Sequence, residues 1–426
     1  MASNASRTTW LASSRRADAC ILALALVLRL AWVAYMEFRV GQLYGPDAKS
    51  YHELALSLLD GHGLQKWDYE GLFTNPKQSM IVYSFRPPLL PVFLAGVYGV
   101  AGPRVWVARI AMALLSAATC VAVARIARRL FTPRAALAAG LLMAVYPKLI
   151  YYSGMIVTEN LYVLLLACSI WLLLWAQETE RSWWPWPVAG AVMGLAALCR
   201  SALLAFPAFA GLWVLIVRPR TRRALGEALL LGMGVAAAMA PWWGRNLAIH
   251  GSFVAATTEG GLTFWVTNRA DADGSGHVDY TPGRGQFDGL SETQIDRKFY
   301  QLGLAHVRAH PGHFLRLMGV KFLRFWRLWP HAAEPSVGLG KAIVAGATFV
   351  PILLLAIAGA LAARRRWRPL LLIYLLILYY TLLHMVFMAI TRYRLPIEPY
   401  LIVLAAVALT RAARRPAKEP PCPTSP

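Results

Sequence analysis

Repeated apolar runs limit most strongly what this chain can fold into. A helix needs about 20 predominantly apolar residues to cross a bilayer, and about ten runs in the 426-residue sequence reach or approach that length. Within lipid each run must satisfy its backbone hydrogen bonds internally, which favours helices. The sequence therefore predicts an all-α polytopic membrane protein with spans at 18–38, 105–127, 135–150, 157–176, 185–199, 202–217, 224–243, 337–361, 369–390 and 397–411.

Basic residues indicate the orientation of these spans. The formal net charge is +22, and clusters of Arg fall in short connections between apolar runs rather than on one polar domain. Because cytoplasmic loops of membrane proteins are enriched in Lys and Arg, the clusters predict that both termini are cytoplasmic. The charge thus reports orientation and not a nucleic-acid partner. We expect cytoplasmic tails at 1–17 and 412–426, the second disordered, around a transmembrane domain at 18–411.

This orientation places two large polar segments on the outer side, at 39–104 and at 244–336, the latter before the last three spans. Within the first, residues 86–102 contain too few apolar residues for a span and predict a half-helix at the outer interface. Within the second, residues 313–329 alternate apolar residues with Arg and Lys, which predicts an interfacial amphipathic helix. None of the five cysteines lies in a long polar loop, so we expect no disulfide.

Two carboxylates stand at the outer ends of apolar segments. Asp47 follows Pro46 in the first outer loop, and Glu159 opens the fourth span from the same side. Paired carboxylates can share a proton or orient an acceptor hydroxyl, which makes both residues catalytic candidates. The alternatives are structural: Asp47 as a helix N-cap, and Glu159 as a charge that complements the helix dipole behind an N-cap at Thr158.

Arginines also occur on the outer side, where they are normally depleted. Arg86 precedes a Pro-Pro pair at the interface, and Arg392 and Arg394 flank Tyr393 between the last two spans. Such cations suit a phosphate, and Tyr393 a stacked sugar. The alternative for Arg86 is a snorkelling anchor of the half-helix. Arg200 joins two short apolar spans and is expected in a cavity wall or as an interfacial anchor.

One arginine lies well inside the first span. Arg29 stands in the run LVLRLAW, with apolar residues on both sides. An intramembrane Arg is costly and is therefore a functional candidate. The alternatives are a structural partner within the bundle or a side chain that snorkels to the interface.

Two patterns approach metal-binding spacings. Residues 271–276 begin like an EF-hand loop, but the twelfth position is Pro282 instead of the bidentate Glu. A group of three histidines is interrupted by Pro311, and His310-Pro311 more simply starts a helix. The group consists of His306, His310 and His313. The sequence thus assigns no cofactor and no metal ligand, and a divalent metal stays an open alternative.

Five motifs occur in one order on the predicted outer side. They are GPDAxxYxxxAxxLxxGxG at 45–63, RPPLLP at 86–91, TE at 158–159, PWWGRN…GSFV…GG at 241–261 and RYRLPIEP at 392–399. The combination resembles the bacterial GT-C superfamily of membrane glycosyltransferases, in the branch of protein-O-mannosyltransferase-like enzymes and lipid A aminoarabinose transferases. The resemblance extends from near residue 20 to residue 411. It implies a GT-C-like helix bundle with outer interfacial helices in the first loop.

The resemblance also implies an activity. Such enzymes transfer a sugar, with inversion, from a polyprenyl phosphate to an acceptor on the outer face of the inner (plasma) membrane. Asp47 would activate or orient the acceptor hydroxyl, and Glu159 falls where a second acidic residue often occurs. Four arginines are expected to converge on one cavity and bind the donor phosphate, namely Arg86, Arg200, Arg392 and Arg394. Aromatic residues available to bind the sugar or the acceptor are Tyr51, Tyr393 and Trp265.

The acceptor and the reaction class have alternatives. Protein O-mannosyltransferases carry Asp-Glu in the first loop, whereas this chain has Asp47-Ala48, so glycan, lipid and protein acceptors are all candidates. A transporter or flippase for an anionic or sugar-linked lipid is the main rival, and it would need a substrate path open to both faces. A scaffold without catalysis is the third hypothesis, and it would tolerate loss of Asp47.

Overall fold

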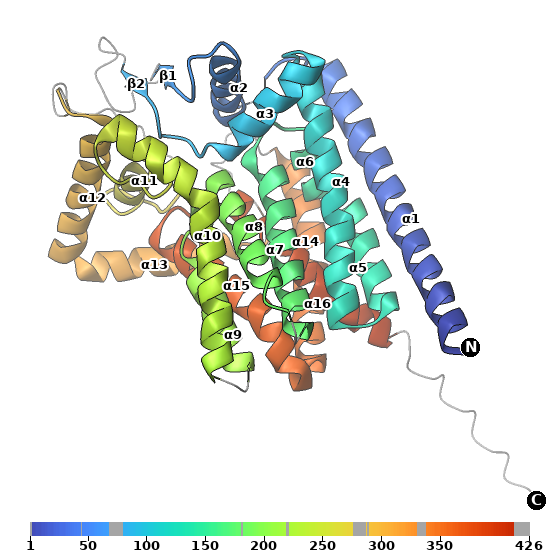
Figure 1. Cartoon of the computed structure of the whole chain (residues 1–426). Helices are drawn as coiled ribbons and strands as arrows, with labels where there is room; N and C mark the ends of the chain where they lie inside the picture. The colour runs from blue at the N-terminus through green and yellow to red at the C-terminus, as the bar shows by residue number, and fades with distance from the viewer. Residues whose placement is uncertain are drawn as a thin grey trace, which may run out of the picture.

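A bundle of long helices carries a layer of shorter elements at one end (Figure 1). The computed structural model describes residues 2–43, 45–67, 80–179, 182–218, 221–275, 287, 289–329 and 338–412, without the side chains of 2–13, Pro46 and Thr221. We name the end that carries α2, α3, α11 and α12 the loop end. The first helix begins and the last one ends at the opposite, terminal end.

Within the described residues, six helices are long and apolar enough to cross a membrane, and a bent pair would make a seventh. The six are α1 (Ala2–Arg39), α4 (Val105–Leu130), α7 (Thr158–Glu178), α10 (Thr221–His250), α14 (Leu339–Ala362) and α15 (Trp367–Val386). The bent pair is α5 (Pro133–Val145) with α6 (Pro147–Ser153), which meet at 54°. The chain is therefore a multi-pass membrane protein.

Each predicted span forms a helix, but the count of ten is not confirmed. The remaining three predicted spans are α8 (Pro185–Cys199), α9 (Phe206–Val217) and α16 (Glu398–Ala412), which have 15, 12 and 15 residues. Helices of this length fall short of the roughly 20 residues that a full crossing needs. The first helix also differs, because it begins at Ala2, inside the predicted tail 1–17. The predicted tail 412–426 lies outside the described residues apart from Ala412.

The loop end is built from the two large polar segments. The first supplies α2 (Pro46–Leu59), a two-residue antiparallel pair of β1 (Lys66–Trp67) with β2 (Ile81–Val82), and α3 (Leu89–Ala101). The second supplies α11 (Gly260–Val266), α12 (Glu292–Ala309) and α13 (Pro311–Phe325). The predicted half-helix at 86–102 thus forms the short helix α3. Three 3-10 turns connect longer helices, namely η1 (Ser201–Leu203), η2 (Arg364–Arg366) and η3 (Thr391–Arg394).

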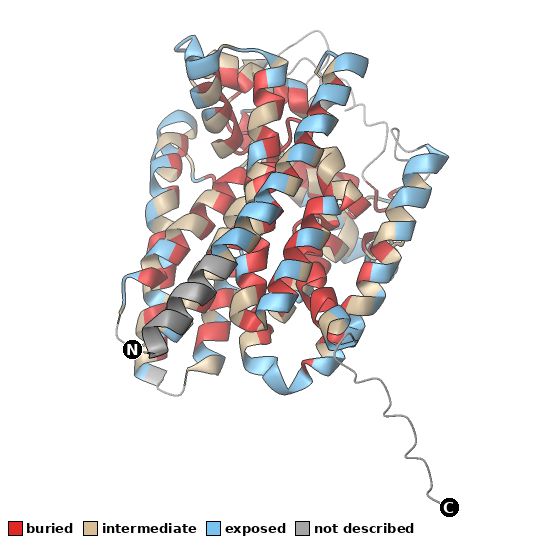
Figure 2. Ribbon diagram, turned by 90° about the vertical axis from the view of Figure 1, so that its right-hand side faces the viewer, coloured by how far each residue is buried: buried red, intermediate tan, exposed pale blue. Residues whose placement is uncertain are grey.

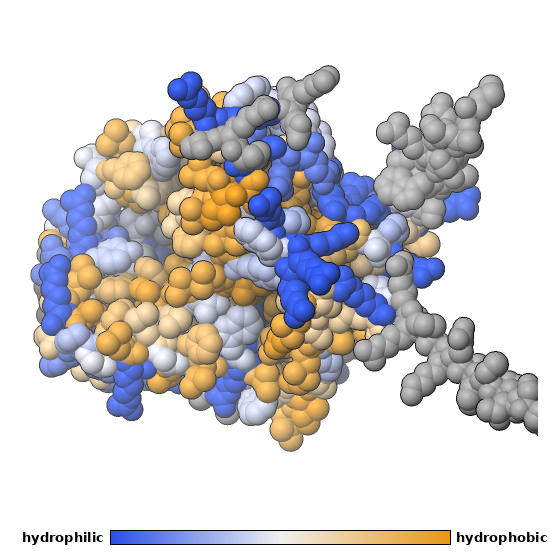
Figure 3. Space-filling view, turned by 90° about the horizontal axis from the view of Figure 1, so that it is seen from below, coloured by the Kyte–Doolittle hydropathy of each residue, from blue (hydrophilic) through white to orange (hydrophobic). Residues whose placement is uncertain are grey.

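Buried residues lie mostly where helices face one another, and exposed and intermediate residues lie mostly on the outward faces of the helices (Figure 2). Large apolar side chains stay exposed on the outside of three spans: Val27 at 65%, Leu229 at 67% and Leu354 at 62%. In water such a surface would be unstable, whereas lipid accepts it. Seen from the terminal end, hydrophilic side chains stand out among apolar ones (Figure 3).

Glycines let α8 and α10 approach closely. An added Cβ at Gly190 or Gly194 would overlap the backbone of α10, and one at Gly234 would overlap the backbone of α8. Small residues at helix interfaces are the usual means of tight packing in membranes, where the hydrophobic effect does not drive association. This contact places the end of α8, and with it Arg200, at a fixed position beside the loop end.

The intramembrane Arg29 has a structural role. Pro147 has no backbone N–H, so the α5–α6 break leaves the last carbonyls of α5 without helical donors. Arg29 donates from Nη1 to the Ala144 carbonyl at 3.0 Å and from Nη2 to the Met143 carbonyl at 3.2 Å. Its Nε donates to the hydroxyl of Ser116 at 2.8 Å. Arg29 therefore serves as a C-cap for a broken helix, contributed by another span.

Replacing Arg29 by Met should lower the stability of the bundle. Two buried carbonyls would lose their donors, each at a cost of about 1–3 kcal/mol. We expect a lower unfolding temperature in detergent for Arg29→Met, and a smaller decrease for Arg29→Lys. Arg15→Met removes an exposed Arg from the same helix and is the control. Equal unfolding temperatures for Arg29→Met and Arg15→Met would contradict the capping role.

Candidate active site

Six charged side chains from separate segments form one chain of ion pairs at the loop end. Arg392 is its centre: Nη1 contacts Asp47 at 2.7 Å, and Nε contacts Glu159 at 2.6 Å. Asp47 also pairs with Arg86 at 3.0 Å, and Glu159 with Arg200 at 2.7 Å. Arg86 continues to Glu259 at 3.2 Å. Acids and bases alternate along the chain in the order Glu259, Arg86, Asp47, Arg392, Glu159 and Arg200.

Each member is placed by the end of a helix or by a short turn. Asp47 and Glu159 lie in the first turns of α2 and α7. Arg200 follows the last residue of α8, and Arg392 lies in η3 between α15 and α16. Helix ends and turns that are distant in sequence therefore meet at the loop end.

The N-caps considered at Asp47 and Thr158 are not adopted, whereas Glu159 does lie in the first turn of α7, where its charge complements the helix dipole. The residue before α2 is Gly45, and the helix has no side-chain cap. The residue before α7 is Val157, again without a side-chain cap. The oxygens of Asp47 and Glu159 instead bind guanidinium groups, so their positions serve the ion-pair chain.

The chain of ion pairs keeps Asp47 charged. Burial alone would raise the pKa of its carboxyl, but Arg392 and then Arg86 outweigh burial, and the pKa lies below the ordinary value. For Arg86, burial lowers the pKa, and Glu259 and Asp47 more than offset this. In this arrangement Asp47 is an oriented, ionised acceptor of hydrogen bonds and a weak base.

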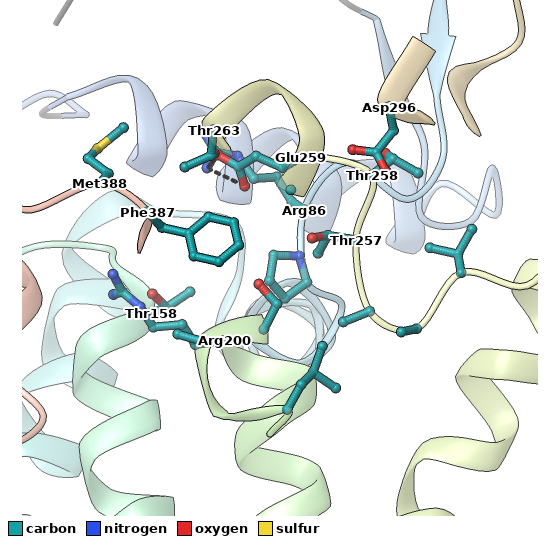
Figure 4. Close-up of a pocket in the computed structure, with 18 of the residues that line it drawn as sticks. Arg86, Thr158, Arg200, Thr257, Thr258, Glu259, Thr263, Asp296, Phe387 and Met388 are labelled. Atoms are coloured by element: carbon teal, nitrogen blue, oxygen red, sulfur yellow. Dashed lines mark hydrogen bonds and ion pairs between the residues drawn. The ribbon is translucent and has the colours of Figure 1, made fainter. Parts of the chain in front are cut away.

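The ion-pair chain lines a cavity of about 510 Å³. Figure 4 shows Arg86, Arg200 and Phe387, which all line this cavity. Tyr51 and Tyr393 line it too, and the guanidinium of Arg200 lies 4.6 Å from the ring centre of Tyr393. Glu159 lies behind Arg392 and Arg200 and is 2% exposed.

One donor in this wall has no partner. The Nε of Arg86 is buried and makes no hydrogen bond among the described residues. A buried N–H without an acceptor costs free energy, and native structures rarely keep one without a ligand or water. Arg86 also pairs with Asp47 and Glu259, so it is not a snorkelling anchor.

Two predicted site residues lie elsewhere. Arg394 was expected to line the same cavity, and this is wrong. It pairs with Glu398 at 2.8 Å and donates to the carbonyls of Phe325 and Arg327, because its position in η3 turns it toward α13 and α16. Trp265 packs in α11 against Phe299 and is not part of the cavity lining.

The sequence interpretation missed Glu259 and the residues that hold Arg86 in place. Glu292 is 3% exposed and accepts hydrogen bonds from the amides of Tyr83 and Ser84 at 2.7 and 3.0 Å. It also accepts one from the Thr258 hydroxyl at 2.5 Å. Arg245 approaches from α10 and donates to the Tyr83 carbonyl at 3.2 Å. Residues of the second polar segment, 244–336, thus fix the backbone of the first polar segment, 39–104, just before Arg86.

Some of these residues had a sequence signal. Glu259 precedes the Gly pair of one motif, and Arg245 stands in PWWGRN, but these motifs alone do not predict a role for either charge. Glu292 lies between Ser291 and Gln294, which form a capping box; the box predicts a helix start but no contact with residue 84.

The described residues contain no cluster of metal-ligating side chains. Within the described ranges no three His, Cys, Asp or Glu side chains are grouped as metal ligands, and each cavity carboxylate of the ion-pair chain faces a guanidinium. Asp271 and Asp273 pair with arginines, while Pro282 lies outside the described residues. His310 lies between α12 and α13, as its Pro neighbour predicted.

Glu159→Gln should destabilise the protein strongly. Removing one partner of a buried ion pair costs about 3–5 kcal/mol, and here both Arg200 and Arg392 lose a counter-charge. The control is Glu178→Gln at the other end of the same helix, whose side chain is 57% exposed beside Arg129. Exposed pairs contribute about 0–1 kcal/mol. Unfolding temperatures measure both, and an equal shift would contradict the central position of Glu159.

Comparison with known proteins agrees with this architecture. Residues 85–244 match the family model described as dolichyl-phosphate-mannose-protein mannosyltransferase. No curated protein sequence matches significantly.

Two solved structures share the fold. ArnT from Cupriavidus metallidurans, bound to undecaprenyl phosphate, aligns with a TM-score of 0.53 and 20% identity over 92% of this chain and 60% of that one. The Archaeoglobus fulgidus oligosaccharyltransferase aligns with a TM-score of 0.56 and 14% identity over 92% of this chain and 50% of that one. The chain thus spans half to three fifths of their lengths. It shares the fold of these two proteins, and the resemblance inferred from its motifs is confirmed at the level of the fold.

Proposed function

We propose that this protein is an inverting glycosyltransferase that takes a sugar from a polyprenyl-phosphate donor at the loop end of the bundle. The observation that carries the proposal is the ion-pair chain, in which three arginines and Asp47 line one cavity. The fold is consistent with it, and ArnT, which shares the fold, was solved with undecaprenyl phosphate.

Arg86, Arg200 and Arg392 would bind the donor phosphate. Guanidinium groups stay protonated and present several donors in a plane, which matches phosphate oxygens. All three are paired with carboxylates now, so an entering phosphate would compete with Asp47 and Glu259 for the same cations.

The reaction has a simple balance. The acceptor hydroxyl oxygen bonds to the anomeric carbon, the bond from that carbon to the phosphate oxygen breaks, and the phosphate takes the electron pair. Asp47 accepts the hydrogen bond of the hydroxyl, orients it and takes its proton. When the phosphate draws Arg86 and Arg392 away from Asp47, the pKa of that carboxyl rises and the residue becomes a better base. The arginines stabilise the phosphate that leaves.

A transporter or flippase is not favoured. The charged cavity lies at one end of the bundle, and Arg29, the intramembrane charge of the first span, is used as a helix cap. Glycan, lipid and protein acceptors would need different binding groups on the cavity wall opposite the arginines.

Asp47→Asn should abolish transfer while the protein still folds. Arg86 and Arg392 each keep a second carboxylate, Glu259 and Glu159, so the ion-pair chain is only partly lost. Transfer is measured in detergent with polyprenyl-phosphate sugars, and folding by thermal unfolding. Wild-type turnover in this variant would refute the role of Asp47, whereas the absence of turnover in the wild-type protein would favour the scaffold hypothesis.

Arg86→Ala should reduce transfer by about 2–4 kcal/mol of transition-state stabilisation, by analogy with loss of an oxyanion donor. Arg86→Lys should restore only part of it, because Lys lacks the planar fork. The control is Arg269→Ala, which removes an Arg of the large polar segment that pairs with Asp271 outside the cavity. Equal losses in Arg86→Ala and Arg269→Ala would argue against phosphate binding.

We further propose that the loop end faces outside the plasma membrane and both termini face the cytoplasm, as the Arg clusters predict. Single cysteines in a cysteine-free background test this by labelling intact cells with an impermeant maleimide. Ala305 on α12 and Arg365 in η2 are exposed and suit the two sides. Ala305→Cys should be labelled and Arg365→Cys should not, and the reverse pattern would invert the topology.

A further inference from the structure

A second wall of the cavity carries polar side chains that the ion-pair chain does not use. Helix α12 contributes Thr293, Asp296, Arg297 and Tyr300 to the lining. Their spacing of three, four and seven residues places them on one helix face. In the view of Figure 4, Asp296 lies across the cavity from Arg200. The cavity thus has an arginine wall on the bundle and a mixed polar wall on α12.

Asp296 is held in a fixed orientation with one oxygen unused. Its Oδ1 accepts a hydrogen bond from the Gly261 amide at 2.7 Å, and Oδ2 has no partner among the described residues. Burial raises the pKa of the Asp296 carboxyl to about 6, and Glu292 adds to this. A carboxylate that is shielded from water and short of donors is well suited to accept hydrogen bonds from ligand hydroxyls.

Aromatic rings adjoin this carboxylate. Tyr300 stacks on Phe264 with ring centres 5.9 Å apart, and Phe264 meets Phe387 edge-on at 5.8 Å. Tyr300 and Phe387 both line the cavity. An aromatic ring offers an apolar face, and the Tyr hydroxyl offers a polar end. Sugars present both kinds of surface, since their C–H faces are apolar and their rims carry hydroxyls.

Other ligand classes fit this wall less well. A phosphate would face the charge of Asp296. An extended peptide binds by pairing with free backbone groups, but the backbone that lines the cavity near residues 254–258 is already engaged. Three of its carbonyls accept hydrogen bonds from side chains: Val254 from Asn246, Ala255 from Trp243 and Ala256 from Trp242. The amide of Thr258 donates to the Ser84 carbonyl.

We propose that the cavity face of α12 is the acceptor subsite and that it binds a carbohydrate through Asp296 and Tyr300. The name acceptor subsite rests on the proposed function, because it presumes a transfer reaction. Binding of a carbohydrate to α12 does not depend on that function. Asp296 accepts hydrogen bonds from ring hydroxyls, and Tyr300 adds a hydroxyl and a ring face.

The test is a binding measurement on the full-length protein in lipid nanodiscs. Saturation-transfer NMR reports contact with a panel of methyl hexopyranosides and methyl pentopyranosides, and with a Thr-containing peptide as the competing class. At least one glycoside should bind to the wild type, and Asp296→Asn and Tyr300→Phe should weaken it by about tenfold or more, since a hydrogen bond to a charged group is lost in the first. The matched control is Asp271→Asn, an exposed acid of the same polar segment, which should bind like the wild type.

Several outcomes would overturn the assignment. They are binding of no glycoside, glycoside binding that is unchanged in both Asp296→Asn and Tyr300→Phe, and peptide binding that depends on Asp296. Thermal unfolding of each variant excludes loss of fold as the cause of weaker binding. Binding of undecaprenyl phosphate is measured separately and should depend on Arg86 but not on Asp296. Its failure in the wild type would refute the donor site while leaving the glycoside result to judge α12.

Discussion

The alternation of three arginines and three carboxylates, of which Glu159 is buried and the others are half-buried, is the interaction on which the loop end depends. Taken singly, a guanidinium in so shielded a place would be costly, because few waters remain to solvate it. In the chain each inner member has two opposite neighbours, so the charges of six helix ends and loops become mutually dependent. A ligand phosphate can enter only by taking over some of these contacts, which links binding to the charge state of Asp47.

The two polar segments behave as one unit above the bundle. Glu292 holds the backbone just before Arg86, and the same carboxylate fixes Thr258 beside Glu259. Both ends of the Arg86–Glu259 pair are therefore positioned by one buried side chain. This explains why a cavity can form at all between segments that are about 170 residues apart in the sequence. The α12 wall belongs to the same unit, since Asp296 follows Glu292 by one turn.

Local patterns predicted the helices well and the contacts unevenly. Apolar runs located each long helix, and proline and histidine marked the α12–α13 junction correctly. The meeting of Asp47, Arg86 and Arg392 followed from their shared side of the membrane. Arg394 could not be separated from Arg392 in this way, because two positions along a tight turn point to different neighbours. Asp296 and Glu292 gave no signal, since their roles arise only when a distant segment folds against α12.

The cap that Arg29 places on α5 has a consequence for biogenesis. Until α1 packs beside α5, the break before Pro147 leaves two carbonyl groups facing a medium that cannot hydrogen-bond them. Helix α5, the third predicted span, therefore cannot satisfy its backbone alone when it enters the membrane, and α1 must stay next to it. We therefore expect the translocon to release these segments together, and a chain lacking α1 to stall at this point and be degraded.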